Sequence, residues 1–219
     1  MDKVELGFFS FTEVTDPGQH RAYNEWHQLD HMPEQFRLPG IAAGHRWVST
    51  PECRAARRVS GELLDPTHYV TMYLVTEPVD ETLRAFMELA EELRRQDRWF
   101  EPRVSHLSGP FRVMAAHASP RIRVSAEALP LRPHRGVWVT VDEDTGSRAS
   151  GEGPPAELSL PGVAGVWSFG SGDRSISVWF LDEPIGGAGP ALGDALGDPA
   201  LFSGPLEAIT PWEWGWFDA

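Results

Sequence analysis

Two short motifs each occur twice in this sequence, in the same order. LPGIA at 38–42 returns as LPGVA at 160–164, and EPV at 77–79 returns as EPI at 183–185, each time at the end of a strand-like segment. Repetition of one motif order along a chain indicates a structural unit that is used twice. We therefore expect two tandem copies of one unit, packed sheet against sheet within a single chain.

The first copy alternates between strand-like and helix-like periodicity. Apolar residues recur at every second position in the strands and at i, i+3, i+4 and i+7 in the helices. The expected elements are a strand at 4–9, a helix from 16 to about 31, a strand at 41–48, an irregular loop at 49–67, a strand at 68–76, a helix through 83–93 and a strand at 111–117. This β-α-β-β-α-β order predicts a ferredoxin-like α+β unit, with one antiparallel sheet and both helices on one face.

The first helix is predicted to bury an apolar stripe. Ala22, Trp26, Leu29 and Phe36 share one face at helical spacing. Pro33 disfavours helical geometry at the residue before it, so we expect the helix to kink or stop there.

The second copy is predicted to be shorter and degenerate. Its first strand is expected at 137–141 and its last strand at 212–217, where three tryptophans alternate onto one face. Between 144 and 160, where the first helix should recur, the chain is rich in glycine and proline and cannot hold a long helix.

The charge of the chain excludes two classes of partner. The formal net charge is −13 at pH 7, which repels phosphate backbones and anionic lipid headgroups, so we expect neither nucleic acid nor a membrane as a partner. No apolar run reaches the roughly 18 residues of a membrane span, and the N-terminus begins with strand-like alternation, so we expect a cytoplasmic protein. The one cysteine, Cys53, cannot form an internal disulfide and is interpreted as inert.

The first helix and the turn after it carry a family motif. The run YNEWHQLDHMPE at 23–34, followed by LPG at 38–40 and Arg46-Trp47, resembles the dimeric α+β barrel superfamily, and its EthD-like members most closely. In that group a Trp, an acidic residue and a His precede an aliphatic residue and Pro, a pattern that DHMP at 30–33 fits. The resemblance implies that the two repeats form one barrel, with a pocket between each sheet and its helices.

The resemblance leaves the activity open. The superfamily includes cofactor-free monooxygenases, cyclases, isomerases, lyases and haem enzymes, so the fold does not decide the function. We divide the chain into a first ferredoxin-like repeat at 1–118 that holds the active site, a linker at 119–134, and a degenerate second repeat at 135–219 that completes the barrel.

Six polar side chains of the first helix lie within roughly 100° of one another on a helical wheel. They are His20, Tyr23, His27, Asp30, His31 and Glu34. Such a stripe is either a solvated helix face or the wall of a site. Imidazole titrates near neutral pH and a carboxylate can orient it, so we interpret the stripe as general acid–base machinery with His27 or His31 as the base. Asp30 is expected to pair with His27 or with a strand residue across the pocket.

The sheet supplies further candidates. His45 and Trp47 share one face of the second strand, and Tyr69, Thr71 and Tyr73 share one face of the third. The sequence does not say which face of either strand looks toward the helices. The residues that we predict to contact the substrate are Tyr23, His45, Trp47 and Tyr73.

A metal site is the main alternative for the same helix. His27 and His31 are four positions apart, a spacing that can present two nitrogens to one zinc ion, and Glu34 could add an oxygen. However, no Glu follows the first His as it does in zinc proteases, and Pro33 disturbs the geometry before Glu34. No histidine lies in a recognisable haem motif. We therefore expect no metal, haem or other cofactor.

The favoured hypothesis is a cofactor-independent enzyme, a monomer or homodimer, that acts on a small apolar or aromatic metabolite. His27, Asp30 and His31 are its catalytic candidates, and a cyclase, isomerase, lyase or monooxygenase reaction fits equally well. The rival hypothesis is a non-catalytic binding or accessory protein of the same fold. We expect any activity in the first repeat, because no histidine follows His134, and we expect the later tryptophans to pack against the first sheet.

Overall fold

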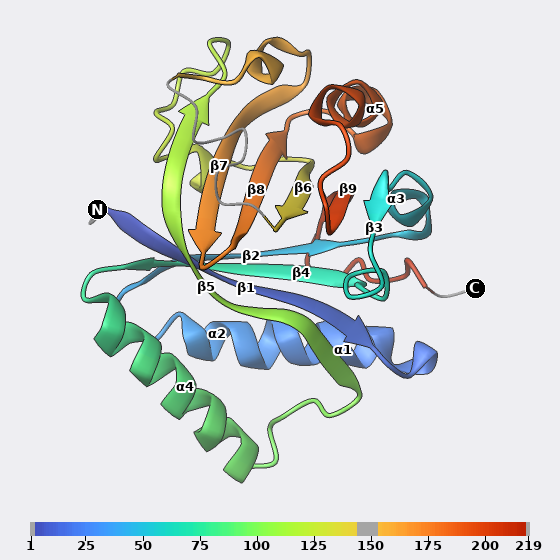
Figure 1. Ribbon diagram of the computed structural model, residues 1–219. Coiled ribbons are helices and arrows are strands. Elements are labelled where there is room, and N and C mark those ends of the chain that lie inside the picture. The colour runs from blue at the N-terminus through green and yellow to red at the C-terminus, as the bar shows by residue number, and fades with distance from the viewer. Residues whose placement is uncertain (1–2, 144–152, 218–219) are drawn as a thin grey trace.

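The chain folds around a closed antiparallel barrel. The structure is a computed structural model that describes residues 3–143 and 153–217. Its main strands are β1 (Val4–Val14), β2 (Ile41–Val48), β4 (Tyr69–Thr76), β5 (Arg103–Ala118), β6 (Gly136–Asp142), β7 (Val163–Ser171), β8 (Arg174–Leu181) and β9 (Phe202–Ala208). They pair in the order β2-β4-β1-β5-β7-β8-β6-β9, and β9 pairs back with β2, so these eight strands close a ring (Figure 1). The two-residue strand β3 (Val59–Ser60) pairs with β9 outside the ring.

The helices lie on the outside of the barrel. They are α1 (His20–Trp26), the π-helical turn η2 (His27–His31), α2 (Met32–Gln35), α3 (Pro51–Ala55), α4 (Val79–Arg95) and α5 (Ile185–Leu196), with short 3-10 turns η1 (Pro17–Gln19), η3 (Leu129–Leu131) and η5 (Ala156–Ser159). Figure 1 shows α1, α2 and α4 together beneath the first four strands, whereas α5 lies beside the second four. None of the helices in the described residues has the length and hydropathy to cross a membrane.

The two halves of the barrel have the same topology. The first half has the order β5-β1-β4-β2, which is the fourth, first, third and second strand of a ferredoxin-like unit. The second half has the order β9-β6-β8-β7, which repeats that arrangement. The predicted fold class, two tandem ferredoxin-like repeats in one α+β barrel, is therefore confirmed. The exact division at 118 and 135 stays a prediction.

The repeated Pro-Gly turn occupies equivalent positions in the two halves. Gly40 and Gly162 have φ angles of +87° and +75°, a left-handed conformation that favours glycine. A Cβ at Gly40 would lie 2.2 Å from Oγ1 of Thr82 on α4, and one at Gly162 would lie 2.7 Å from Cβ of Ala188 on α5. Each glycine thus lets the turn before a strand approach the helix of its own repeat.

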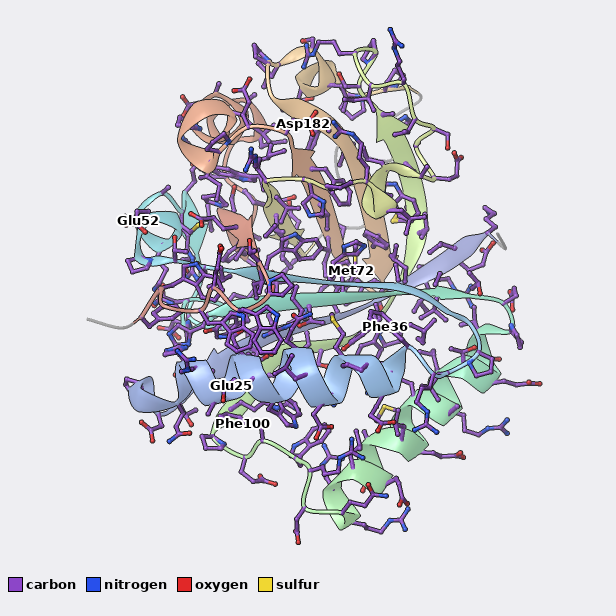
Figure 2. All side chains as sticks on the ribbon, turned by 180° about the vertical axis from the view of Figure 1, so that it is seen from behind. Glu25, Phe36, Glu52, Met72, Phe100 and Asp182 are labelled. Atoms are coloured by element: carbon purple, nitrogen blue, oxygen red, sulfur yellow. The ribbon has the colours of Figure 1, made fainter. Side chains whose placement is uncertain are left out.

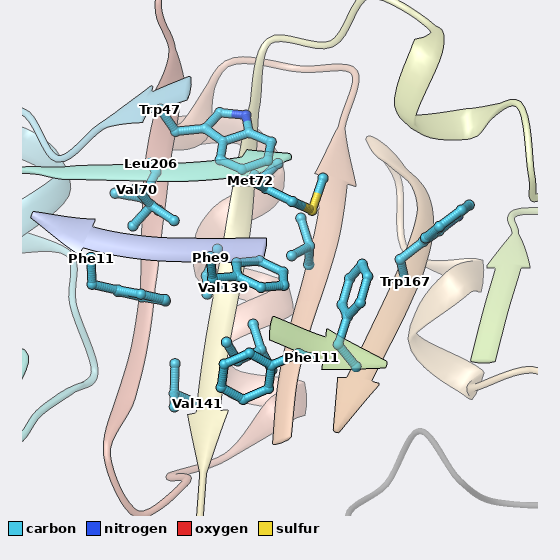
Figure 3. Close-up of a cluster of buried hydrophobic side chains, with 14 of the residues drawn as sticks. Phe9, Phe11, Trp47, Val70, Met72, Phe111, Val139, Val141, Trp167 and Leu206 are labelled. Carbon is cyan, nitrogen blue, oxygen red and sulfur yellow. The ribbon is translucent and has the colours of Figure 1, made fainter. Parts of the chain in front are cut away.

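The interior of the barrel is a packed hydrophobic core (Figure 3). Phe9 and Phe11 of β1 point inward beside Trp47 of β2, and Phe169 and Phe180 approach from the second half. The rings of Phe9 and Phe169 meet edge to face with centroids 5.0 Å apart. The two repeats therefore bury one common core.

The predicted last strand is wrong. Residues 212–217 form turns and irregular chain, and Trp212 is 72% exposed, whereas β9 lies earlier, at Phe202–Ala208. Gly204 and Pro205 argue against a strand by local rules, yet the strand forms because it is held between β6 and β2. The expected packing of the later tryptophans on the first sheet is also wrong for Trp138 and Trp179, which pack toward α5.

The predicted apolar stripe of the first helix is wrong as well. Leu29 and Phe36 are each 47% exposed, whereas His27, His31 and Gln35 are buried. Pro33 neither stops nor breaks the helix, because α2 continues to Gln35. The predicted absence of a long helix at 144–160 falls partly outside the described residues, and the described part of it, from 153, contains η5.

Candidate functional site

The two histidines of the first helix lie on one turn of π-helix. The backbone N–H of Met32 donates to the carbonyl oxygen of His27, an i→i+5 bond. Residues four apart share one face of a helix, and across this turn the rings of His27 and His31 meet edge to face with centroids 5.1 Å apart. Figure 2 shows the helix running without a break from Glu25 to Phe36.

Both histidines line a cavity of about 240 Å³ between the first sheet and its helices. The helices contribute His27, His31 and Gln35 from one side and α4 from the other, while the sheet forms the floor. The full lining is Phe8, Ser10, His27, His31, Gln35, Thr71, Tyr73, Phe86, Met87, Ala90, Arg94, Trp99, Arg103, Ser105 and Ser108.

His27 is held between two tyrosine hydroxyls. Its Nδ1 lies 3.1 Å from the Tyr23 hydroxyl and its Nε2 lies 3.3 Å from the Tyr73 hydroxyl. Burial, with Arg46 and His31 adding to it, lowers the pKa of His27 well below 6.5. Burial also raises the pKa of Tyr73. At neutral pH the site therefore holds a neutral imidazole beside a protonated phenol.

His31 has one nitrogen to spare. Its ring stacks on Trp26 with centroids 4.6 Å apart, and its Nε2 lies 3.5 Å from the carboxamide of Gln35. Among the described residues, Nδ1 of His31 has no hydrogen-bond partner, and the same holds for Oε1 of Gln35 and Oγ1 of Thr71. Burial, followed by Arg103, lowers the pKa of His31 to about 3.

Arginines surround the two histidines. Arg46 is buried and donates to Oδ1 of Asn24, 2.9 Å away, while Arg94 and Arg103 both stack on Trp99, at 4.0 and 4.5 Å from its ring. Burial lowers the pKa of Arg103. Among the described residues no carboxylate lines the cavity, although Arg94 pairs with Glu91 at 2.7 Å on α4. The site is therefore cationic, although the whole chain carries a charge of −13.

Asp30 is not part of this cavity. Its carboxylate pairs with Arg98, with Oδ1 2.7 Å from Nη2, and Glu34 pairs with the same guanidinium at 2.8 Å. Asp30 lies 100° from its neighbours on the helix and projects toward the loop after α4, so it neither pairs with His27 nor reaches the sheet. Glu34 likewise does not join His27 and His31, so the three-residue metal set suggested by the sequence is not brought together.

The three strand candidates do not lie on the same side of the sheet. Tyr73 faces the helices and contacts His27, but Trp47 faces the barrel interior. His45 lies on the same side of β2 as Trp47, and their stacked rings have centroids 5.7 Å apart. The His45 ring also lies 5.9 Å from the ring of His134. The structure therefore places Tyr73 in the cavity and Tyr23 directly behind His27, and it places His45 and Trp47 elsewhere.

Several lining residues were missed from the sequence. Phe86, Ala90 and Arg94 follow one another at i, i+4 and i+8 on α4, so the helical pattern could have included Arg94. Trp99 and Arg103 carried no such signal, because they follow the helix in irregular chain and at the start of β5.

Comparison with solved structures supports the fold described above. No family model matches the sequence, and no curated protein matches it. The structure of the provisionally named chlorite dismutase TA0507 superposes with a TM-score of 0.51 at 12% identity, over 95% of each chain. That of an anthrone oxidase-like protein superposes with a TM-score of 0.52 at 12% identity, over 96% of this chain and 94% of that one. The fold is that of a dimeric α+β barrel. At this identity the likeness concerns the fold alone.

The cavity is too small for a haem, the cofactor that some dimeric α+β barrels bind. Its volume of about 240 Å³ is below the range of about 300–1,000 Å³ that drug-sized ligands occupy, and a haem is larger than those. The residues do not fit a haem here. Within the part of the chain that is described, no three His, Cys, Asp or Glu side chains are grouped to hold a metal ion.

The buried histidines predict a pH dependence of stability. In the unfolded chain they protonate near pH 6.5, whereas burial holds the pKa of His31 at about 3 and that of His45 at about 4 in the folded protein. Between these values the unfolded state binds more protons, so stability is expected to fall as the pH falls, by up to about 1.4 kcal/mol per pH unit for each histidine. Urea unfolding from about pH 7.5 to about pH 5 measures this slope. His31→Gln should flatten it, and an unchanged slope would contradict the assignment.

Proposed function

We propose that this chain is a cofactor-independent enzyme that moves a proton on a small, mainly aromatic molecule, with His27 as the general base. The observation that carries the proposal is the neutral His27 imidazole, oriented by the Tyr23 hydroxyl and facing a cavity that also holds Tyr73. A base held by a second group and adjoining a site for the reacting atom is the arrangement that proton abstraction needs.

The chemistry follows from the groups around the cavity. His27 Nε2 would take a proton from a carbon next to a carbonyl group, and the electron pair of that C–H bond would move onto the carbonyl oxygen. The bond from Tyr73 to Nε2 is long at 3.3 Å, so its hydroxyl can donate to the oxyanion instead. The guanidinium charges stabilise that oxyanion, and they cost no reorganisation because packing already holds them.

The same geometry explains how a base of low pKa can act. Desolvation and nearby arginines disfavour a proton on His27 in the empty site. A substrate that carries or develops negative charge offsets those arginines and raises the pKa of the imidazole toward neutrality. Return of the proton to another carbon gives an isomer, a reaction that is balanced without an oxidant.

Hydrogen exchange tests the proposal without knowledge of the natural substrate. Single-ring aromatic ketones with an acidic C–H, starting with phenylacetone because the cavity holds about 240 Å³, are incubated with the protein in D2O. Loss of the C–H signal in proton NMR, faster than in buffer, is the expected result. Probes that bind but exchange at the buffer rate would overturn the proposal.

That outcome would favour the second candidate, a non-catalytic binding protein. The unpaired side-chain atoms of His31, Gln35 and Thr71 favour it, because a bound polar molecule would complete their hydrogen bonds without reacting. We further infer from the DHMP motif at 30–33 that the chain is an EthD-like member of the superfamily.

Asp30→Asn is expected to leave the exchange rate unchanged within about twofold, because the Asp30 carboxylate pairs with Arg98 outside the cavity. The pair is about one-third exposed, so its loss should lower the free energy of unfolding by no more than about 1 kcal/mol. The exchange assay and urea unfolding measure the two effects. A tenfold lower exchange rate in Asp30→Asn would instead indicate that Asp30 takes part in catalysis.

A further inference from the structure

We propose that the cavity binds organic anions, namely a single aromatic ring that carries a carboxylate, with the carboxylate against Arg103 and the ring packed against Phe8 and Phe86. This inference rests on the proposed function, since it names the substrate class of the same site. It is carried by the contacts of Arg103 and by polar atoms that the protein itself leaves unpaired.

Arg103 forms no ion pair with any carboxylate of the described residues. Its Nη1 donates to Ser105 Oγ at 3.3 Å, its guanidinium lies over the rings of Trp26 and Trp99 at 5.2 and 4.5 Å, and its Nε has no partner among the described residues. The carboxylate of Glu101 acts on the pKa of Arg103 through its charge but forms no ion pair with the guanidinium. A partly buried guanidinium with open donors is stabilised by a carboxylate that accepts from it.

Three more buried residues leave polar atoms unused at the same cavity. His31, Gln35 and Thr71 are 7%, 0% and 2% exposed, and each has one side-chain nitrogen or oxygen without a partner in the described chain. Buried polar atoms are nearly always paired, because an unpaired one has lost its hydrogen bonds to water without replacement. Their grouping at one cavity indicates that a polar ligand completes them.

The sheet adds hydroxyl donors beside Arg103. In the antiparallel pairing of β1 and β5, Ser10 lies opposite Ser108 and Thr12 lies opposite Ser105, so these side chains share the face toward the helices. The hydroxyls of Ser10 and Ser105 are 3.0 Å apart. A carboxylate at this end would meet a guanidinium and hydroxyl groups, and no carboxylate of the lining would repel it.

The other end of the cavity is aromatic. The rings of Phe8 and Phe86 have centroids 4.8 Å apart, and Phe86 also meets Tyr73 at 5.4 Å. This apolar surface favours binding of the aromatic ring of the ligand. With about 240 Å³ of space, one ring with a short acidic side chain suits the cavity better than a fused polycycle.

Three probes of similar shape but different charge test whether the cavity prefers an anion. Phenylacetate, 2-phenylethanol and 2-phenylethylammonium are titrated into the protein by calorimetry at low salt. Phenylacetate is expected to bind at least about tenfold more tightly than the alcohol, since a hydrogen bond to a charged group contributes about 1.5–3 kcal/mol, and the ammonium ion should bind most weakly. Equal affinity for the acid and the alcohol would overturn the inference.

Variants assign the effect to Arg103. Arg103→Met keeps the aliphatic stem on Trp99 and should weaken phenylacetate at least about tenfold while leaving the alcohol unchanged. Arg103→Lys keeps the positive charge and should retain part of the affinity for phenylacetate. This variant therefore distinguishes the contribution of the charge from that of side-chain packing. Arg95→Met, on the exposed side of α4, is the matched control and should change neither. Full affinity in Arg103→Met would place the anion elsewhere and overturn the assignment.

The binding result is independent of turnover. If phenylacetate binds as expected and no probe exchanges hydrogen, the substrate class stands and the proposed proton transfer fails. If ketones exchange but the acid has no advantage over the alcohol, proton transfer stands and the anion preference fails.

Discussion

Replacement of Trp47 by alanine is expected to lower the free energy of unfolding by about 3–5 kcal/mol, as for other buried aromatic rings. The side chain is fully buried in the barrel interior (Figure 3), and its strand is paired to β9 where the ring closes, with Trp47 opposite Ala208. Its indole N–H donates to His134 Nε2 at 2.9 Å, so truncation also removes a partner from that nitrogen. Urea unfolding followed by circular dichroism measures the loss.

Trp212→Ala is the matched control. Trp212 is 72% exposed, so its removal should change stability by no more than about 0.5 kcal/mol. The pair of variants also tests the barrel closure. A large loss in Trp212→Ala together with a small one in Trp47→Ala would favour a strand at 212–217 and contradict the position of β9.

His27→Gln is expected to slow hydrogen exchange by about 10²–10⁴-fold, the usual contribution of a positioned general base. Glutamine can still meet the Tyr23 and Tyr73 hydroxyls, so no hydroxyl must be left unpaired inside the protein. The amide does not accept a proton at neutral pH, so the effect should appear in the exchange rate constant and not in probe affinity. NMR exchange rates at saturating probe measure it.

His117→Gln on β5 controls for loss of an imidazole outside the cavity and should keep the full rate. Tyr73→Phe should slow exchange by about tenfold or more, because it removes the donor to the oxyanion. Unchanged exchange in His27→Gln would transfer the role of base to His31, whose Nδ1 is unpaired.

Local patterns predicted most of the elements of the first repeat. The strand expected at 41–48 is β2, and the helix expected through 83–93 lies within α4. These segments have clear periodicity and end at Pro or Gly, and such signals act between near neighbours. β5 is longer than predicted because pairing with both β1 and β7 extends it beyond its apolar centre.

The site was only partly predictable for a physical reason. A helical wheel at 100° per residue places His31 about 40° from His27 and so groups their rings, but it groups Asp30 with them as well, although the Asp30 carboxylate pairs with Arg98 outside the cavity. Nor does the wheel indicate that the polar face is the buried one, since Leu29 would be expected inside and is half exposed. Arg98, which holds Asp30, is remote in sequence from it.

The sequence by itself determined the doubled ferredoxin-like plan, the Pro-Gly turns and the segment that carries the histidines, because periodicity and turn chemistry are local properties. Only the tertiary structure decided which faces look inward. Alternation along a strand defines two faces but does not say which of them lies inside. Pairing of β2 with β9 closes the ring, and in the closed barrel Trp47 lies in the core whereas Tyr73 lines the cavity. The cationic lining likewise arises from strands and helices far apart in the chain, because tertiary packing alone brings Arg94, Arg103 and the histidines together.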